Sequence, residues 1–325
     1  MREGLVIRTT GSWYRVLVEC GMRNAEREDP ATCNLLDCRL RGNYRLRGSK
    51  QTNPVAVGDR VLFEMQADGT GLIHEVQDRR NYIVRRATKL SKQTHVIAAN
   101  IDLLCIVATL GLPRTSTGFI DRLLVTAEAY HIPAAILFNK SDLLANDELR
   151  AMQHDLSHLY RSIGYPVLEI SALTGSGLDE VKQLIGGKTV LFSGHSGVGK
   201  SALLNALSPG LGLKVGSLSD WSLKGRHTTT FAEIFPLPTA HYSLPTYLID
   251  TPGIKEFGMV DFNRQELSHF FPEMRAVLPE CHFANCTHRH EPGCAVLQAV
   301  ADGHISAERY HNYLSILEDV ESPTN

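Results

Sequence analysis

The chain has 325 residues, of which 43% are hydrophobic and 21% charged, with a formal net charge of -2. This composition is that of an ordinary globular protein of two or three domains, and it excludes a uniformly basic nucleic-acid coat. The sequence shows no secretion signal and no apolar run near the ~20 residues that span a bilayer. Seven cysteines in such a chain favour reduced thiols, so we expect a cytoplasmic protein without a membrane partner.

Residues 1–88 are predicted to form a small β-barrel. Apolar and polar side chains alternate in short segments, as in half-buried strands, at 14–18, 36–40, 61–65 and 72–76. Asp68-Gly69 predicts a hairpin turn before the last segment. Short strands joined by polar turns fit the OB-fold, a five-stranded barrel that often binds nucleic acids.

A basic strip at residues 39–50 contains five positive charges, no acid and one aromatic ring. It could be a solvated loop, but cations for phosphate and a ring for stacking are also what an RNA-binding surface needs. The candidate RNA-binding residues are Arg39, Arg41, Tyr44, Arg45 and Arg47.

Residues 89–258 are predicted to form a doubly wound α/β domain. Apolar runs at 103–108, 134–138, 167–170, 190–192 and 247–249 indicate buried parallel strands, and 119–130 and 178–185 indicate helices between them. Such domains bind their ligands at the carboxyl ends of the strands.

A phosphate-binding loop follows the strand at 190–192. The run matches G-x-x-x-x-G-K-[ST] and stands before a predicted helix, which is the required context. Its glycines allow the backbone to wrap phosphates, the lysine reaches the β- and γ-phosphates, and the serine hydroxyl binds Mg²⁺. The loop is Gly194, His195, Ser196, Gly197, Val198, Gly199, Lys200 and Ser201.

Two further loops indicate that the base is guanine. In Asn139-Lys140-Ser141-Asp142, the Asp142 carboxylate can accept hydrogen bonds from the ring N–H and the amine of guanine, which adenine does not offer. Asn139 would contact the base edge or tie loops together, and Lys140 would pack on the base. Ser171-Ala172 resembles the loop whose backbone touches the guanine oxygen.

The run 250–253, D-T-P-G, follows the strand at 247–249, a position from which it can contact Mg²⁺ and the γ-phosphate. Asp250 would hold Mg²⁺ through water, and the Gly253 amide would sense the γ-phosphate. In the segment 225–230, G-R-H-T-T-T, either Thr229 or Thr230 could complete the Mg²⁺ shell.

The order of these motifs predicts a circular permutation. The guanine loops at 139–142 and 171–172 precede the phosphate loop, whereas most GTPases begin with the phosphate loop. A compact domain tolerates such a change when its original termini lie close together.

Residues 259–325 are predicted to be helical, with a Cys/His-rich cluster inside. Three thiols and an imidazole within fourteen residues suit a closed, structural zinc site. The expected ligands are Cys281, Cys286, His288 and Cys294, with His282 and His290 as competing nitrogen ligands.

Taken together, the barrel, the permuted motifs, G-R-H-T-T-T and the C-x4-C-x-H-x5-C cluster resemble the bacterial ribosome small-subunit-dependent GTPases. The resemblance covers essentially the whole chain. It implies an OB-fold on RNA, a GTPase and a zinc domain, which act on nearly finished 30S subunits and their rRNA. A monomer is expected.

We therefore expect hydrolysis of GTP to GDP and phosphate, stimulated by the small subunit. The alternative is an RNA-binding module in which GTP only sets the conformation. Ile254 stands after the D-T-P-G motif and cannot orient water as a glutamine would, so intrinsic hydrolysis should be slow. Lys200 and His227 are the catalytic candidates; His227 would orient water, or else only pack within its loop.

Overall fold

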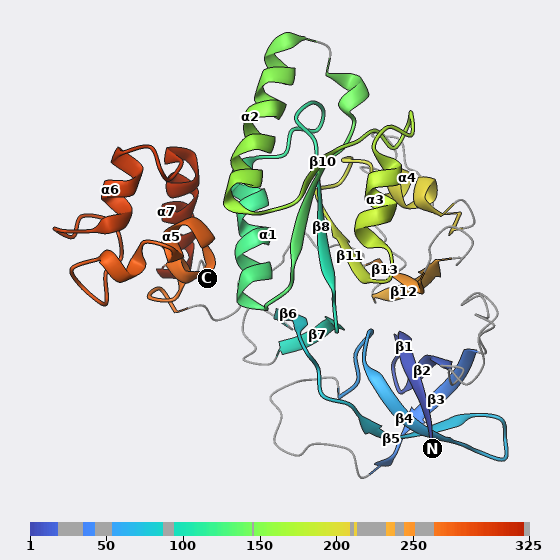
Figure 1. The fold of residues 1–325 in the computed structure, drawn as a ribbon. Coiled ribbons are helices and arrows are strands. Elements are labelled where there is room, and N and C mark those ends of the chain that lie inside the picture. Colours follow the sequence, from blue (N-terminus) through green and yellow to red (C-terminus); the bar gives the residue numbers. More distant parts are fainter. Residues whose placement is uncertain are drawn as a thin grey trace.

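The computed structural model describes residues 1–18, 35–42, 54–86, 94–144, 146–208, 211–212, 232–237, 244–250 and 263–321. Figure 1 shows a barrel, a sheet flanked by helices and a group of C-terminal helices. Among these residues, no helix has both the length and the apolar character needed to cross a membrane.

The N-terminal barrel is confirmed. Its strands are β1 (Arg2–Thr10), β2 (Trp13–Val18), β3 (Leu35–Leu40), β4 (Arg60–Met65) and β5 (Gly71–Val76). They are hydrogen-bonded in the order β1-β2-β3-β5-β4, and pairing of β1 with β4 closes the barrel. Alternation did not reveal β1, because four consecutive residues of this strand are buried.

The central sheet has five parallel strands in the order β10-β9-β8-β11-β13. These are β8 (Leu103–Ala108), β9 (Ala134–Phe138), β10 (Val167–Glu169), β11 (Thr189–Ser193) and β13 (Thr246–Asp250), as predicted to within a residue or two. A further strand, β12 (Glu233–Leu237), pairs antiparallel with β13. β12 also meets β1 of the barrel, where Arg8 lies opposite Glu233.

Helices cover both faces of this sheet. α1 (Thr117–Ala129) and α2 (Asp147–Ile163) lie on one face, and α3 (Leu178–Ile185) and α4 (Lys200–Leu207) lie on the other (Figure 1). Alternate side chains of β8 enter the two cores, with Leu104 on the α1 face and Cys105 on the α3 face. The sequence analysis missed α2, whose fully buried residues are the polar or amphipathic Gln153, Ser157 and Tyr160.

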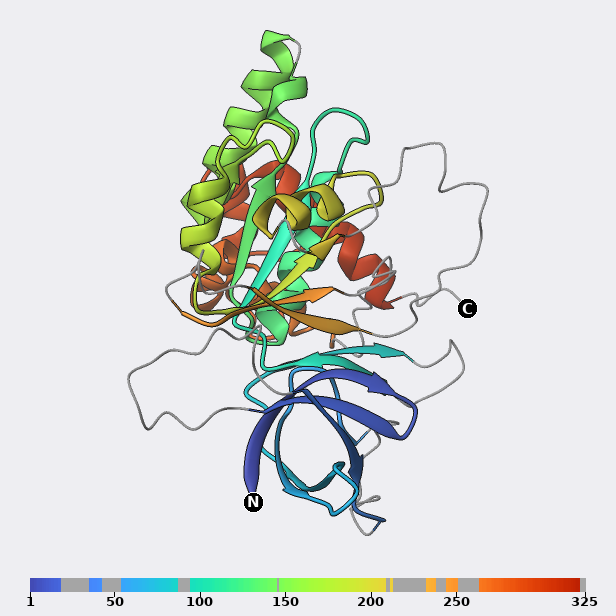
Figure 2. The same ribbon diagram turned by 90° about the vertical axis from the view of Figure 1, so that its right-hand side faces the viewer.

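The hairpin β6 (Tyr82–Arg86) and β7 (Thr94–Ala99) lies between the barrel and the sheet (Figure 2). Buried polar contacts fix the segments that flank this hairpin. Asn100 donates to the carbonyl of Gly58 at 2.9 Å, and Arg79 pairs with the fully buried Asp59 at 2.7 Å.

The C-terminal part is helical, as predicted. It contains the 3-10 turns η6 (Leu267–Phe270) and η7 (Leu278–Glu280), and the helices α5 (Pro272–Arg275), α6 (Ala295–Ala301) and α7 (Ala307–Glu321). On α7, Tyr313 and Leu317 enter a core that also contains Val125 of α1. The C-terminal helices therefore pack directly on the sheet's flanking helix.

Candidate nucleotide and metal sites

The predicted phosphate loop connects β11 to α4, at the carboxyl edge of the parallel sheet. The fully buried Val198 anchors the loop in the core beneath it. Lys200 opens α4 and its ammonium donates to the carbonyl of His195 at 2.8 Å and to that of Gly194. Backbone N–H groups at a helix start, beside a lysine, form an environment suited to phosphate.

Asn139 ties the phosphate loop to both base loops. Its amide nitrogen donates to the carbonyl of Val198 at 2.8 Å, and its amide oxygen accepts from the backbone of Ala172 at 3.0 Å. The close approach explains Gly199, where φ is +93° and a Cβ would lie 2.5 Å from the Asn139 nitrogen. Three loops that are distant in sequence thus meet at one buried side chain.

Asp142 stands exposed at the same edge, after β9. Its carboxylate accepts a hydrogen bond from Ser171, whose hydroxyl in turn accepts from the backbone of Thr174 at 3.1 Å. Lys140 has a left-handed backbone (φ 64°) and donates through Nζ to the carbonyl of Leu112 at 3.0 Å. The carboxylate is thus oriented while remaining accessible to a ligand.

The predicted Mg²⁺ ligands are described only in part. Ser201 lies in the first turn of α4, and β13 ends at Asp250 in parallel register with β11, Ile249 lying opposite Leu191. The backbone of Asp250 is therefore at the same edge as the phosphate loop. The side chain of Asp250 and the candidates His227, Thr229, Thr230 and Gly253 lie outside the described part of the chain.

Of the candidate RNA-binding residues, the structure describes Arg39 and Arg41. The Arg39 guanidinium lies over the Trp13 ring, 3.9 Å from its centroid, and Arg41 is exposed just beyond β3. Tyr44, Arg45 and Arg47 lie outside the described residues. A stacked Arg–Trp pair on the barrel is a contact that the basic strip alone did not predict.

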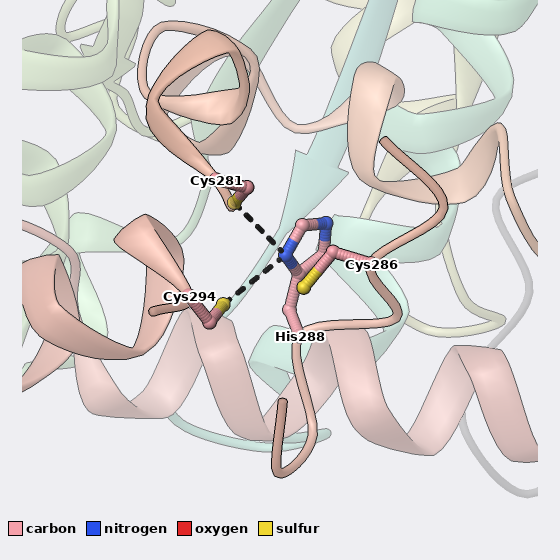
Figure 3. Close-up of side chains that lie close together, drawn as sticks. All are labelled: Cys281, Cys286, His288 and Cys294. Carbon is pink, nitrogen blue, oxygen red and sulfur yellow. Dashed lines mark hydrogen bonds between the residues drawn. The ribbon is translucent and has the colours of Figure 1, made fainter. Parts of the chain in front are cut away.

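The four expected metal ligands come together (Figure 3). One ligand atom from each of Cys281, Cys286, His288 and Cys294 lies within 4.8 Å of all the others. Nδ1 of His288 is 3.8 Å from the sulfur of Cys281 and 3.4 Å from that of Cys294. A tetrahedral zinc ion with ordinary bond lengths separates N and S ligands by about 3.5 Å, so the residues fit such an ion.

The structure also separates the competing imidazoles. His282 and His290 are exposed and outside the cluster, whereas His288 is buried within it. A left-handed backbone at His288 (φ 58°) turns its ring inward.

Neighbouring side chains hold the ligand loop in this shape. Tyr310 of α7 donates to the carbonyl of His288 at 2.7 Å, and Tyr313 donates to that of Thr287 at 2.9 Å. The carboxylate of Glu291 accepts from three backbone N–H groups and one hydroxyl of the loop, which lowers its pKa despite an opposing effect of burial. The cluster is therefore supported by a framework beyond its four ligands.

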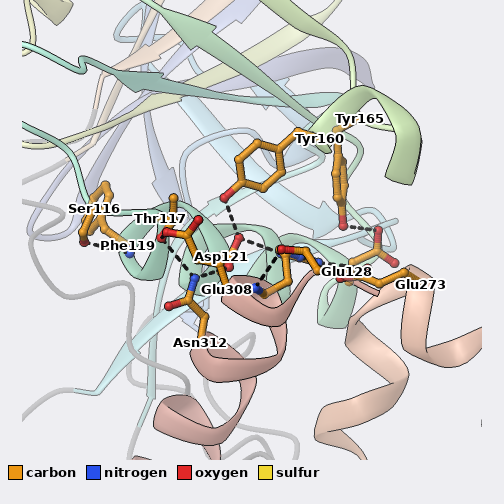
Figure 4. Close-up of polar contacts among 12 residues, drawn as sticks. Ser116, Thr117, Phe119, Asp121, Glu128, Tyr160, Tyr165, Glu273, Glu308 and Asn312 are labelled. Atoms are coloured by element: carbon orange, nitrogen blue, oxygen red, sulfur yellow. Dashed lines mark hydrogen bonds and ion pairs between the residues drawn. The ribbon is translucent and has the colours of Figure 1, made fainter. Parts of the chain in front are cut away.

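A buried polar network joins α1 to the C-terminal helices (Figure 4). Arg309 of α7 donates to Asp121 of α1 at 2.6 Å and pairs with Glu273 of α5 at 2.7 Å. Tyr160 of α2 and Asn312 of α7 also donate to Asp121. The sequence analysis missed these residues, although Arg309 is spaced like Tyr313 and Ile316 on the buried face of α7.

Comparison with known proteins agrees with this arrangement over the whole chain. A family model described as RsgA GTPase matches residues 76–260, and one described as RsgA N-terminal domain matches residues 3–73. A curated relative from Bacteroides fragilis, named small ribosomal subunit biogenesis GTPase RsgA, is 50% identical over 98% of this chain and 97% of its own. A relative of the same name from Porphyromonas gingivalis is 47% identical, over 98% and 96% respectively.

Two solved structures share the fold. The crystal structure of YjeQ from Thermotoga maritima matches with a TM-score of 0.76 and 33% identity, covering 98% of each chain. That of YloQ, titled a circularly permuted GTPase, matches with a TM-score of 0.73 and 28% identity, covering 100% of this chain and 96% of that one. The predicted permutation is confirmed: β9 and β10, which carry the base loops, precede β11 along the chain.

Proposed function

Because this chain belongs to the RsgA GTPase family, we propose that it hydrolyses GTP in the biogenesis of the small ribosomal subunit. The observation that carries the proposal is the position of Asn139. This one buried side chain joins the phosphate loop to the loop that begins at Ser171, beside the exposed carboxylate of Asp142. A guanine base and its phosphates can therefore be held at one edge of the sheet.

In the proposed complex, Asp142 accepts hydrogen bonds from guanine, and the stem of Lys140 packs on the base. Lys200 places its ammonium beside the β- and γ-phosphates, and the amides of the phosphate loop bind their oxygens. Ser201, Asp250 and one of the two switch threonines would hold Mg²⁺, which offsets the phosphate charge. Gly253 would report the γ-phosphate.

His227 is proposed to orient the attacking water, since Ile254 cannot do so. Its loop would be ordered by the RNA of the small subunit, which makes hydrolysis dependent on that partner. His227→Ala should then retain GTP binding and subunit association and lose most of the stimulated rate. Full stimulation in this variant would place the catalytic group elsewhere.

The Cys281, Cys286, His288 and Cys294 cluster is proposed to hold one structural Zn²⁺. Four protein ligands leave no position for a reacting water, so the ion would stabilise the fold rather than act on GTP.

Three parts would divide the work: residues 1–88 binding rRNA, 89–258 binding GTP and 259–325 binding zinc. Arg39 and Arg41 support the rRNA contact through exposed positive charge on the barrel. We propose a cytoplasmic monomer that binds the 30S subunit.

The alternative, an RNA-binding module in which GTP is only a conformational ligand, is not favoured, because the family is one of GTPases. Phosphate release measured with and without 30S subunits tests the proposal. We expect slow release by the chain alone and a large increase with 30S subunits but not with 50S subunits. Equal rates in all three conditions would refute the proposed coupling to the small subunit.

A further inference from the structure

Phe119, in the first turn of α1, stacks on His195 of the phosphate loop. The two ring centroids are 3.6 Å apart and the planes are inclined by 28°. Both side chains are half-buried, so the contact lies at the margin of the core. Phe119 belongs to none of the nucleotide motifs, and it reaches the loop from a helix on the opposite face of the sheet to α4.

The turn that carries Phe119 is fixed from both sides. Within α1, the hydroxyl of Ser116 accepts from the backbone of Phe119 at 3.3 Å (Figure 4). From α7, Glu308 accepts a hydrogen bond from Thr117 at 2.6 Å, and Asn312 donates to the same hydroxyl at 3.2 Å. The C-terminal part thus holds α1 two residues away from the stacked ring.

The next contact along α1 resists sliding of the helix. Asp121 is fully buried and receives hydrogen bonds from Arg309, Asn312 and Tyr160. Moving α1 along its axis would leave this carboxylate without its cation in a low-dielectric interior, which is costly. The contacts from α7 therefore help to fix the place of Phe119, together with the packing of α1 on the sheet.

We propose that Phe119 is a positioning residue for the phosphate loop and that the docking of α7 on α1 sets its place. The ring of Phe119 holds His195, and with it the start of the loop whose backbone would bind phosphate. This inference rests on the proposed binding of a guanine nucleotide, but it assigns a role to Phe119 and α7, which lie outside the nucleotide motifs. It links the metal-binding part of the chain to phosphate affinity.

The stack and ordinary core packing differ in the side chains that they accept at position 119. A core position would accept leucine, which is apolar and nearly as large, whereas a ring stack requires another ring. Phe119→Leu therefore removes the stack and retains apolar burial, and Phe119→Tyr retains the stack. Tyr130→Leu is the matched control, because Tyr130 ends the same helix and its ring contacts Tyr82, with centroids 5.9 Å apart.

The experiment measures the affinity of the full-length chain for GDP and for inosine diphosphate, together with the melting temperature. The ratio of the two affinities reports on the base site, since inosine lacks the exocyclic amine that Asp142 would bind. Phe119→Leu should lower the affinity for both nucleotides by the same factor, about three- to tenfold, as expected for the loss of one ring stack. Phe119→Tyr and Tyr130→Leu should stay within about twofold of the wild type.

Equal affinity in the wild type and Phe119→Leu would overturn the positioning role. So would an equal loss in Tyr130→Leu, which would indicate general loosening of α1. Should Phe119→Leu melt too low to measure, Phe119→Met carries the same expectation. A wild-type chain that does not bind GDP would instead refute the proposed function.

A double-mutant cycle tests the link to α7. Asn312→Ala removes hydrogen bonds to Thr117 and Asp121. In the otherwise wild-type chain it should lower the affinity for GDP about twofold. In the Phe119→Leu background the same change should have no further effect, because the ring that transmits it is gone. Additive losses would show that α7 acts independently of Phe119.

Discussion

Replacement of Arg309 by methionine tests how the C-terminal helices are held. The Arg309 side chain is 1% exposed and that of Asp121 is 0% exposed, and 2.6 Å separates Nη1 from the carboxylate. Two further nitrogens of Arg309 bond the carboxylate of Glu273, at 2.7 and 3.0 Å. Methionine keeps much of the length and packing of the side chain but removes the charge, so Asp121 loses its buried cation.

The expected loss of stability arises because Arg309→Met removes one partner of a buried ion pair and leaves the other in place. Such a change costs about 3–5 kcal/mol of unfolding free energy, because a charge stays buried without compensation. Glu273, whose side chain is 11% exposed, contributes less than Asp121 because it lies closer to water. We therefore expect most of the loss to come from Asp121.

The loss should also depend on pH. Burial raises the pKa of Asp121, and the Arg309 guanidinium is the largest of the effects that oppose it. Without Arg309 this pKa rises further above its value in the unfolded chain, about 4. A carboxyl with a raised pKa stabilises the fold least at high pH. The loss therefore grows as pH rises from the wild-type pKa of Asp121, which is already above the unfolded value, toward the higher pKa of the variant.

Urea unfolding followed by circular dichroism, at about pH 6 and about pH 8, measures both effects. Arg289→Met is the control, since Arg289 pairs with Glu321 at 2.8 Å in the same part but is 32% exposed, and should cost less than about 1 kcal/mol. Adding Asp121→Asn to Arg309→Met should abolish the pH dependence of this loss of stability. A loss below about 1 kcal/mol, or one that is equal at both pH values, would refute the reasoning.

Three further predictions concern the sites. Asp142→Asn should weaken GTP by about 10- to 150-fold and improve binding of xanthosine triphosphate, whose base presents an acceptor where guanine has its amine; unchanged preference in competition binding would contradict the assignment. Gly199→Ala should lower GTP affinity about tenfold or more, because an alanine there has a strained φ and its Cβ meets Asn139. A titration with labelled GTP measures the affinity, and a wild-type value would contradict the close packing of Asn139 on the phosphate loop. The purified chain should contain about one zinc ion by elemental analysis, and Cys286→Ala should lose it and lower the melting temperature while GTP binding persists; zinc-free wild-type protein would exclude the metal assignment.

The sequence alone was sufficient for the motifs that are contiguous in the chain. The phosphate loop, the Asn139–Asp142 run and the Cys/His cluster each depend on backbone conformations and donors within a few residues of one another. The permutation could also be predicted, because it is a statement about the order of such motifs. The strands of the central sheet were predictable as well, since both faces are covered and their apolar runs are nearly uninterrupted.

Only the tertiary structure decided which of these segments and side chains contact one another. It selected His288 over His282 and His290, because the choice depends on which ring the surrounding loop turns inward. It revealed β1, whose run of four consecutive buried residues shows no alternation. α2 also emerged only in the structure, although its apolar residues, Leu149, Met152, Leu156 and Ile163, recur at helical spacing and pack against the core. It also joined Asp121 to Arg309 across 188 residues of chain, a pairing that no local pattern contains, because the energy of a buried charge depends on what folding brings beside it.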